Sequence, residues 1–175
     1  MDPELEQLAR EMVEVAYLQG DFVLRSGRRS NYYFDKYLFE TQPSILRRVG
    51  SRLAQMVPAG TQRLAAPELG AVLLGGAVSM ELGIPLILVR KKSKDYGTQK
   101  TLEGVLQAGE RVTMIEDVLT TGGAAMDAIV AVREAGGEVL DLIAVLDREE
   151  GAASNLRRLG VEMRSLLRRG DLAPA

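Results

Sequence analysis

An apolar run near the middle of the chain, followed by two acids and a glycine-rich turn, constrains the fold most strongly. The run from Val112 to Ile115 is rich in β-branched residues and too apolar to alternate, which predicts a buried parallel strand. Glu116 and Asp117 are expected to end this strand. Residues 120–123 (Thr-Thr-Gly-Gly) then form a turn, and helical periodicity resumes over residues 124–133. The stretch predicts a strand, a loop and the start of a helix.

The same alternation of strand and helix extends over most of the chain. Strands are expected to end at residues 66, 89, 116 and 147, with a last strand at 161–166 and a polar tail from 168. Helices are expected at residues 43–56, 71–82, 124–133 and 152–159. This order predicts an α/β fold with a parallel sheet and helices on both faces, in which ligands bind beyond the carboxyl ends of the strands. A length of 175 residues suits a single domain, residues 1–175.

The first 40 residues are expected to form a small segment of one helix and one β-hairpin. Asp2 and Pro3 cap an amphipathic helix that ends before Gly20. The hairpin comprises residues 21–25 and 31–35, joined by a turn at 26–30. Aromatic side chains cluster in its second strand, close in sequence to several arginines. For an arbitrary hairpin, the favoured interpretation is a strand packed on the first helix with its arginines in solvent.

The turn at residues 120–123 has the features of an anion site. A loop between a strand and a helix offers unpaired backbone N–H groups and the positive end of the helix dipole. A phosphate fits such a loop, but Glu116 and Asp117 would repel it unless they bind another part of the same ligand. Ribose hydroxyls or a magnesium ion would suit these carboxylates. The alternative is a strand that happens to end in acids, with Thr and Gly capping the next helix.

A second candidate site is the basic segment 90–100, which follows the apolar strand 86–89. Only five of the 22 basic residues are lysines, and four of the five lie between positions 91 and 100. A charge run is usually a solvated surface loop. The selective use of lysine, a flexible point charge, favours instead a segment that binds phosphate groups.

The composition excludes several classes of function. The chain contains no Cys and no His, which excludes thiolate nucleophiles, disulfides, histidine-based triads and the common zinc sites. The net charge of −2 and the pI of about 5.4 argue against nucleic acid or an acidic membrane surface as the main partner. No apolar run approaches the ~20 residues of a membrane span, and the acidic N-terminus is unlike a signal peptide. A cytoplasmic protein is expected.

The sequence of residues 116–123, Glu-Asp-Val-Leu-Thr-Thr-Gly-Gly, resembles the signature with which type I phosphoribosyltransferases bind 5-phosphoribosyl pyrophosphate (PRPP). Residues 22–30 and 32–35 are similar to the N-terminal hairpin, a hood over the base, of the orotate phosphoribosyltransferases. The segment 90–100 resembles the catalytic loop of the same family. The resemblance implies a type I phosphoribosyltransferase fold with a hood within residues 1–40. It also implies that orotate and PRPP are converted to orotidine 5′-monophosphate and pyrophosphate in pyrimidine biosynthesis.

The resemblance also implies a role for each residue that matches a family motif. Those expected to bind PRPP are Arg90, Lys91, Lys94, Tyr96, Glu116, Asp117, Val118, Leu119, Thr120, Thr121, Gly122, Gly123 and Ala124. Those expected to bind orotate are Thr120, Arg148, Arg25, Tyr33 and Phe34, and the amides of Glu68, Leu69 and Gly70 are expected to contact pyrophosphate. The catalytic residues are expected to be Lys91, Lys94, Tyr96 and Asp117. For Arg148, the alternative is an ion pair with its acidic neighbours.

The expected cofactor is Mg²⁺, held mainly by PRPP itself rather than by protein ligands. The expected assembly is a homodimer in which each catalytic loop reaches the neighbouring subunit. The chain departs from the family pattern at Tyr96, Arg25 and Leu69, where His, Lys and Lys are more usual. A purine phosphoribosyltransferase and a non-catalytic PRPP-sensing regulator that binds nucleic acid are the remaining alternatives.

Overall fold

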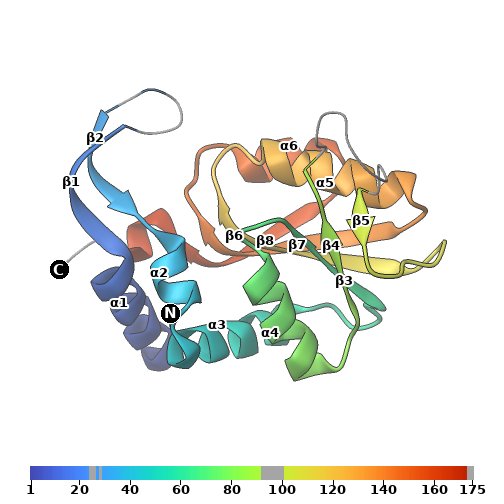
Figure 1. Cartoon of the computed structure of the whole chain (residues 1–175), viewed down its shortest axis with the longest axis horizontal. Helices are drawn as coiled ribbons and strands as arrows, with labels where there is room; N and C mark the ends of the chain where they lie inside the picture. The colour runs from blue at the N-terminus through green and yellow to red at the C-terminus, as the bar shows by residue number, and fades with distance from the viewer. Residues whose placement is uncertain (24–26, 28, 92–100, 173–175) are drawn as a thin grey trace.

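A computed structural model describes residues 1–23, 27, 29–91 and 101–172 of the chain. Its main element is a six-stranded sheet in the order β5-β4-β3-β6-β7-β8 (Figure 1). The strands are β3 (Arg63–Pro67), β4 (Leu86–Val89), β5 (Leu102–Glu103), β6 (Arg111–Leu119), β7 (Glu138–Asp147) and β8 (Glu162–Arg168). All neighbours are parallel except β5, which runs antiparallel to β4. The predicted α/β fold with a mainly parallel sheet is confirmed.

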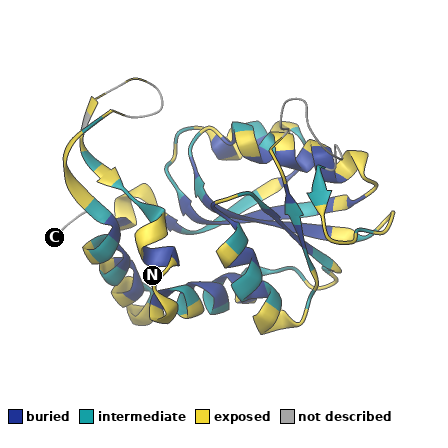
Figure 2. Ribbon diagram, viewed as in Figure 1, coloured by how far each residue is buried: buried dark blue, intermediate teal, exposed yellow. Residues whose placement is uncertain are grey.

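Helices cover both faces of this sheet, and each face has its own apolar core. The helices of one face are α1 (Pro3–Ala16), α3 (Pro43–Met56) and α4 (Val72–Leu82), and those of the other are α5 (Gly123–Glu134) and α6 (Ala152–Arg158). Strand β6 contributes to both cores. Ile115 packs in the core with α1, α3 and α4, whereas Val112 and Met114 pack in the core with α5 and α6. The central strands are accordingly buried over most of their length (Figure 2).

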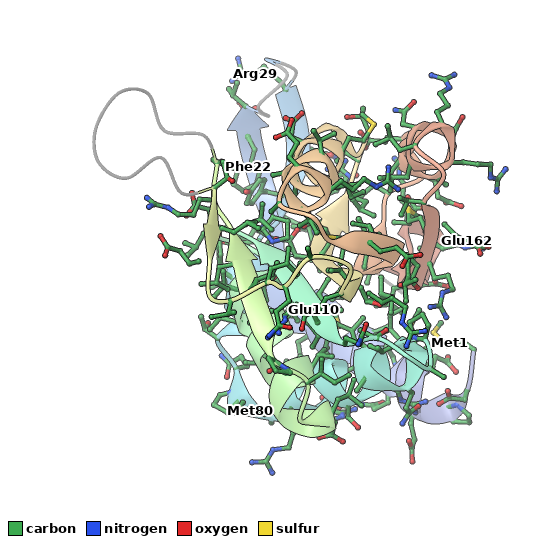
Figure 3. The ribbon with its side chains drawn as sticks, turned by 90° about the vertical axis from the view of Figure 1, so that its right-hand side faces the viewer. Met1, Phe22, Arg29, Met80, Glu110 and Glu162 are labelled. Atoms are coloured by element: carbon green, nitrogen blue, oxygen red, sulfur yellow. The ribbon has the colours of Figure 1, made fainter. Side chains whose placement is uncertain are left out.

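The N-terminal segment forms the predicted helix and hairpin beside this body. Strands β1 (Tyr17–Val23) and β2 (Arg29–Phe34) pair in antiparallel register, from Tyr17 opposite Phe34 to Val23 opposite Arg29. They form a separate two-stranded sheet that projects from the body in Figure 1. Figure 3 places the Arg29 end of this hairpin and Met80 of α4 at opposite ends of the molecule.

Several predicted boundaries were wrong, and the most informative error concerns β6. The strand does not end at Glu116 and Asp117 but continues to Leu119. It can continue because β7 extends as far and pairs with its last residues, Val118 opposite Leu146 and Leu119 opposite Asp147. The strand ladder therefore satisfies the backbone on both sides of the acids, and their carboxylates are held on a regular strand.

Short elements were also missed at the edges of the predicted pattern. The first helix ends at Ala16, and strand β1 begins directly after it at Tyr17, four residues before the predicted start of the hairpin at residue 21. The two-residue strand β5, a five-residue helix α2 (Lys36–Glu40) and a 3-10 turn η1 (Arg169–Leu172) were not predicted. In η1, Leu172 is buried, so the segment after residue 168 is not simply a polar tail.

Candidate functional site

A cavity of about 900 Å³ lies at the carboxyl ends of β3, β4 and β6. Its walls come from segments 67–70, 89–91 and 116–125, the adjoining face of α5, and Lys36 of α2. Residues from all three segments that the sequence singled out after these strands therefore border one cavity, and for the segment 90–100 these are Arg90 and Lys91. Parallel strands bring their carboxyl ends to one edge of the sheet, which explains why segments so distant in sequence meet there.

The loop at residues 120–123 is held in place through its carbonyl groups. The Thr120 carbonyl accepts a hydrogen bond from Ala152 N (3.1 Å), and the Thr121 carbonyl accepts one from the Asn155 side-chain amide (2.9 Å). The Gly122 carbonyl accepts the Met126 N–H inside α5 (2.9 Å). Helix α6 thus fixes the back of the loop and leaves the other side facing the cavity.

The N–H groups at the start of α5 are the natural anion-binding groups of this loop. Gly122 adopts a left-handed conformation (φ 79°), which a residue with a side chain rarely adopts, and helix α5 begins directly after it. The first three helical residues, Gly123 to Ala125, have no carbonyl one turn earlier to which their N–H groups could donate. These amides border the cavity, and the helix dipole adds a partial positive charge. The arrangement fits a phosphate group.

Glu116 and Asp117 form the acidic floor of the same cavity, and both are almost fully buried (7% and 4% exposed). Burial and, to a smaller extent, the charge of Asp117 raise the pKa of Glu116 to about 8. At neutral pH the Glu116 carboxyl is therefore largely protonated, which reduces the negative charge of the cavity floor. A protonated carboxyl group can both donate and accept hydrogen bonds, which suits ligand hydroxyls.

Sequence reasoning missed Lys36, which also lines the cavity. Its ammonium group forms an ion pair with Asp117 Oδ2, and only 28% of its side chain is exposed. Burial lowers the pKa of Lys36, but the charge and the hydrogen bond of Asp117 outweigh burial, so the pKa is raised overall. The lysine is therefore charged. One signal could have indicated it: Lys36 is the sole lysine of the sequence outside positions 91–100, and it follows the predicted hairpin directly.

The turn at residues 68–70 forms another wall of the cavity. Glu68 accepts a hydrogen bond from Lys91 N (2.9 Å) and lies 3.7 Å from Arg90 Nε, so it links this turn to the segment that follows β4. Gly70 packs directly on the acid floor. A Cβ atom added to Gly70 would lie 2.8 Å from Asp117 Cγ and closer still to its Oδ2 and to the Lys36 ammonium.

Of the residues predicted to bind the base, Thr120 lines the cavity, but the other described ones do not. Arg148 forms an ion pair with Glu150 (3.0 Å), which is the alternative considered for it, and it is not among the described residues that line the cavity. Tyr33 packs on Phe22 within the hairpin (ring centroids 5.6 Å apart), and Phe34 packs on Phe39 of the core (5.9 Å). Neither reaches the cavity wall.

Three predicted site residues, Arg25, Lys94 and Tyr96, lie outside the described residues. Lys91 and Arg90 are described, and both line the cavity. The structure therefore brings the described residues that were expected to bind phosphate, ribose and pyrophosphate to one cavity. The roles of these residues, of the hairpin and of Arg148 all remain predictions.

Within the described ranges, no cluster of three or more acidic side chains is arranged as a metal site. The chemistry of the site nevertheless fits Mg²⁺, which is typically bound through one or two carboxylates together with phosphate oxygens of a ligand and water. Because Glu116 is largely protonated, Asp117 would be the carboxylate available to the ion, although Lys36 already contacts one of its oxygens. No helix in the described part of the chain is long and apolar enough to cross a membrane.

A further buried acid, Glu40 of α2, lies behind the cavity floor. It is fully buried, and neither of its carboxylate oxygens has a hydrogen-bond partner among the described residues. Burial and then the charge of Asp117 raise the pKa of Glu40 to about 8, from 4.5 in the unfolded chain. The folded state therefore keeps a proton that the unfolded chain loses, so this group costs stability progressively between about pH 4.5 and pH 8.

We expect Glu40→Gln to remove this pH dependence. The gain in unfolding free energy over the parent chain should be small at pH 5 and should grow to roughly 2–4 kcal/mol at pH 8. Urea unfolding at several pH values measures this difference, with Glu14→Gln, which removes an exposed acid of α1, as the matched control. Parallel stability curves for the Glu40 variant and the parent chain would contradict the assignment.

The chain was compared with known proteins. It matches no family model. It is 46% identical over 172 residues to the orotate phosphoribosyltransferase of Methanocella arvoryzae, covering 98% of this chain and 97% of that protein. Its structure is similar to that of Mycobacterium tuberculosis H37Rv orotate phosphoribosyltransferase in complex with Fe(III) dicitrate, with a TM-score of 0.87, 31% identity and coverage of 98% and 100%.

The M. tuberculosis enzyme has also been solved in complex with PRPP. That structure matches this chain with a TM-score of 0.81 and 30% identity, and the match covers 97% of this chain and 99% of the other. Both likenesses extend over nearly the whole chain, so they include the hairpin and the sheet as well as the loops of the cavity.

Proposed function

The chain belongs to the orotate phosphoribosyltransferases, and from this premise we propose that it transfers the 5-phosphoribosyl group of PRPP to orotate, giving orotidine 5′-monophosphate and pyrophosphate. The observation that carries the proposal is the convergence, in one cavity, of a phosphate-binding helix start and a partly neutralised acid pair. This combination matches a phosphorylated ribose. A ligand with a phosphate alone would gain nothing from Glu116 and Asp117.

The proposed binding mode follows the walls of the cavity. The 5-phosphate binds at the N–H groups of residues 121–124, and the ribose hydroxyls bind Glu116 and Asp117. The pyrophosphate lies against the amides of the turn at 68–70, next to Arg90 and Lys91. Val118 and Leu119 complete the strand that supports these groups.

In the reaction, the bond between C1 of the ribose and the pyrophosphate oxygen breaks, and its electron pair leaves with pyrophosphate. A ring nitrogen of orotate forms the new bond to C1, and the proton of that nitrogen is released to solvent. Because the ribose gains positive and the leaving group gains negative charge, the protein contributes mainly by placing charges. Lys91, Lys94 and Tyr96 are proposed to stabilise the leaving pyrophosphate, and Asp117 holds the ribose. Bound Mg²⁺ would supply further positive charge to the pyrophosphate oxygens.

Orotate itself is proposed to bind between Thr120 and the hairpin. Arg148 would leave Glu150 to form a bidentate pair with the orotate carboxylate, for which its planar guanidinium is suited. Arg25, Tyr33 and Phe34 would approach the base from the hood. The hairpin would have to move for Tyr33 to contact the base, since Tyr33 is not among the described residues that line the cavity.

An absorbance assay tests the proposed reaction. Orotate is incubated with PRPP, Mg²⁺ and the protein, and its consumption is followed beside parallel reactions with adenine, hypoxanthine and xanthine. We expect consumption of orotate alone. Consumption of a purine with orotate left intact would show that the proposed acceptor is wrong.

A homodimer is the proposed assembly, with Lys94 and Tyr96 of each subunit serving the neighbouring site. Helix α4 supports it because its outer face is apolar: Leu73 and Met80 are 43% and 83% exposed. Gly76 lies between them on this face, since residues three and four apart are neighbours on a helix. We propose this face of α4 as the contact between the subunits.

We expect Met80→Glu to convert a dimer into a monomer, because it places a charge in the apolar contact. Light scattering after size exclusion measures the mass of each variant. Val105→Glu, at an exposed apolar residue outside α4, serves as the control and should leave the dimer intact. A dimeric Met80→Glu protein would exclude this face as the interface.

A further inference from the structure

Lys36 is placed where three parts of the molecule meet. It is the first residue of α2, directly after the hairpin strand β2 and the capping residue Asp35. Its ammonium group contacts Asp117 of the acid floor, and it lies against Gly70 of the pyrophosphate turn, where an added Cβ would overlap it. One cation therefore touches both the proposed ribose site and the proposed pyrophosphate site.

The charge balance of the cavity indicates that Lys36 is important for binding an anionic ligand. The described acids that line the cavity outnumber the described cations, with Glu68, Glu116, Asp117, Asp127 and Glu134 against Lys36, Arg90 and Lys91. Arg90 is already close to two carboxylates, Glu68 (3.7 Å) and Glu103 (3.4 Å). Lys36 is also less exposed than Arg90, at 28% against 43% for the side chains. A ligand with a pyrophosphate group needs cations at this position, and Lys36 is the most buried of those available.

We propose that Lys36 is a PRPP-binding residue that exchanges partners, contacting Asp117 in the free enzyme and the pyrophosphate of PRPP in the complex. The proposal rests on the proposed function, because it assigns the pyrophosphate to the turn at 68–70. It adds a residue that none of the sequence motifs contains.

Two features make the exchange physically reasonable. The ribose hydroxyls donate hydrogen bonds to Asp117 when PRPP binds, so they replace the lysine as partners of that carboxylate. The lysine ammonium is a point charge on a flexible stem, and it can turn from Asp117 to the adjacent turn at Gly70 without movement of the backbone. The Tyr37 ring, 5.2 Å from the ammonium, offers a weak cation-π contact in the free enzyme.

The partner exchange predicts different effects on ligands with and without pyrophosphate. Removal of the ammonium in Lys36→Met should weaken binding of Mg²⁺-PRPP and of Mg²⁺-pyrophosphate by about 10- to 100-fold, the usual value of a hydrogen bond to a charged group. The affinity for ribose 5-phosphate, which lacks the pyrophosphate, should change by less than about 3-fold. This ligand makes no contact with the lysine that the substitution could remove, and in the variant its hydroxyls no longer compete with the lysine for Asp117. Lys36→Arg should retain most of the PRPP affinity.

Isothermal titration of all three ligands into the full chain measures these effects. Arg47→Met removes one exposed positive charge outside the cavity and controls for the change in net charge. Equal losses for PRPP and ribose 5-phosphate, or no loss for PRPP, would overturn the proposal. If the parent chain consumes orotate with PRPP but Lys36→Met binds normally, this inference alone fails; if the parent chain binds no PRPP, the proposed function fails.

A second pair of variants covers the case in which Lys36→Met does not fold. The single change leaves Asp117 buried without its cation, whereas Lys36→Met with Asp117→Asn removes both charges together. The double variant is then compared with Asp117→Asn alone. A further 10-fold or greater loss of Mg²⁺-pyrophosphate affinity in the double variant is expected, and equal affinities would contradict a direct contact.

Discussion

Alanine in place of Gly70 is expected to lower kcat/KM for PRPP by at least about 100-fold, the scale that an ångström of misplacement in a catalytic site can cost. The new Cβ would lie 2.8 Å from Asp117 Cγ, a separation that real Cβ atoms essentially never show. Lys36 can move aside because its stem is flexible. Asp117 is short and buried, so it has to rotate away from the position in which it would hold the ribose.

Steady-state kinetics and PRPP titration of the Gly70→Ala protein test this expectation. Gly170→Ala is the matched control, since a Cβ added there meets no atom within 4 Å, and its kcat/KM should equal that of the parent chain. Thermal unfolding of both variants separates a local effect from a loss of fold. A Gly70→Ala protein with kcat/KM within about 3-fold of the parent value would show that the turn and the acid floor are not part of one site.

The Lys94→Ala variant is expected to lose about 100- to 1,000-fold in kcat with less than a 3-fold change in PRPP affinity. Lys94 is proposed to stabilise the charge that develops on pyrophosphate as the bond to C1 breaks. An interaction made mainly in the transition state affects turnover and leaves the binding of the ground state nearly unchanged. Single-turnover rates and equilibrium titration measure the two quantities separately.

Lys92→Ala provides the control within the same segment, because Lys92 has no assigned role. The kcat of the Lys92→Ala protein should fall only slightly below that of the parent chain. Losses of equal size in kcat and in PRPP affinity for Lys94→Ala would contradict a role in the transition state and would favour simple electrostatic attraction of the ligand.

The fold was predictable wherever one local pattern decided the structure. The apolar strands 86–89 and 112–115 and the periodic helix 43–56 were located correctly, because burial dictates their composition. The extension of β6 through Glu116 and Asp117 was not predictable, because acids normally end a strand. Here the neighbouring strand β7 supplies the pairing that keeps it regular, and that pairing is a tertiary property.

The candidate site was predictable to the extent that its groups belong to local motifs. The loop at 120–123 and the turn at 68–70 each follow a strand, so the rule for parallel sheets placed them at one edge. Lys36 could not be found in this way, since its partner Asp117 is 81 residues away and α2 shows no motif. Glu40 was missed for a similar reason: it is an acid in a five-residue helix, and only the packed structure reveals that it is buried.

The central claim is that one cavity binds PRPP in a defined orientation, and a crystal structure of the protein with PRPP and Mg²⁺ tests it most directly. We predict density for the 5-phosphate at the N–H groups of residues 121–124, ribose hydroxyls on Glu116 and Asp117, and pyrophosphate at the turn 68–70 beside Lys36. PRPP bound with its 5-phosphate at the turn, or bound outside this cavity, would contradict the account.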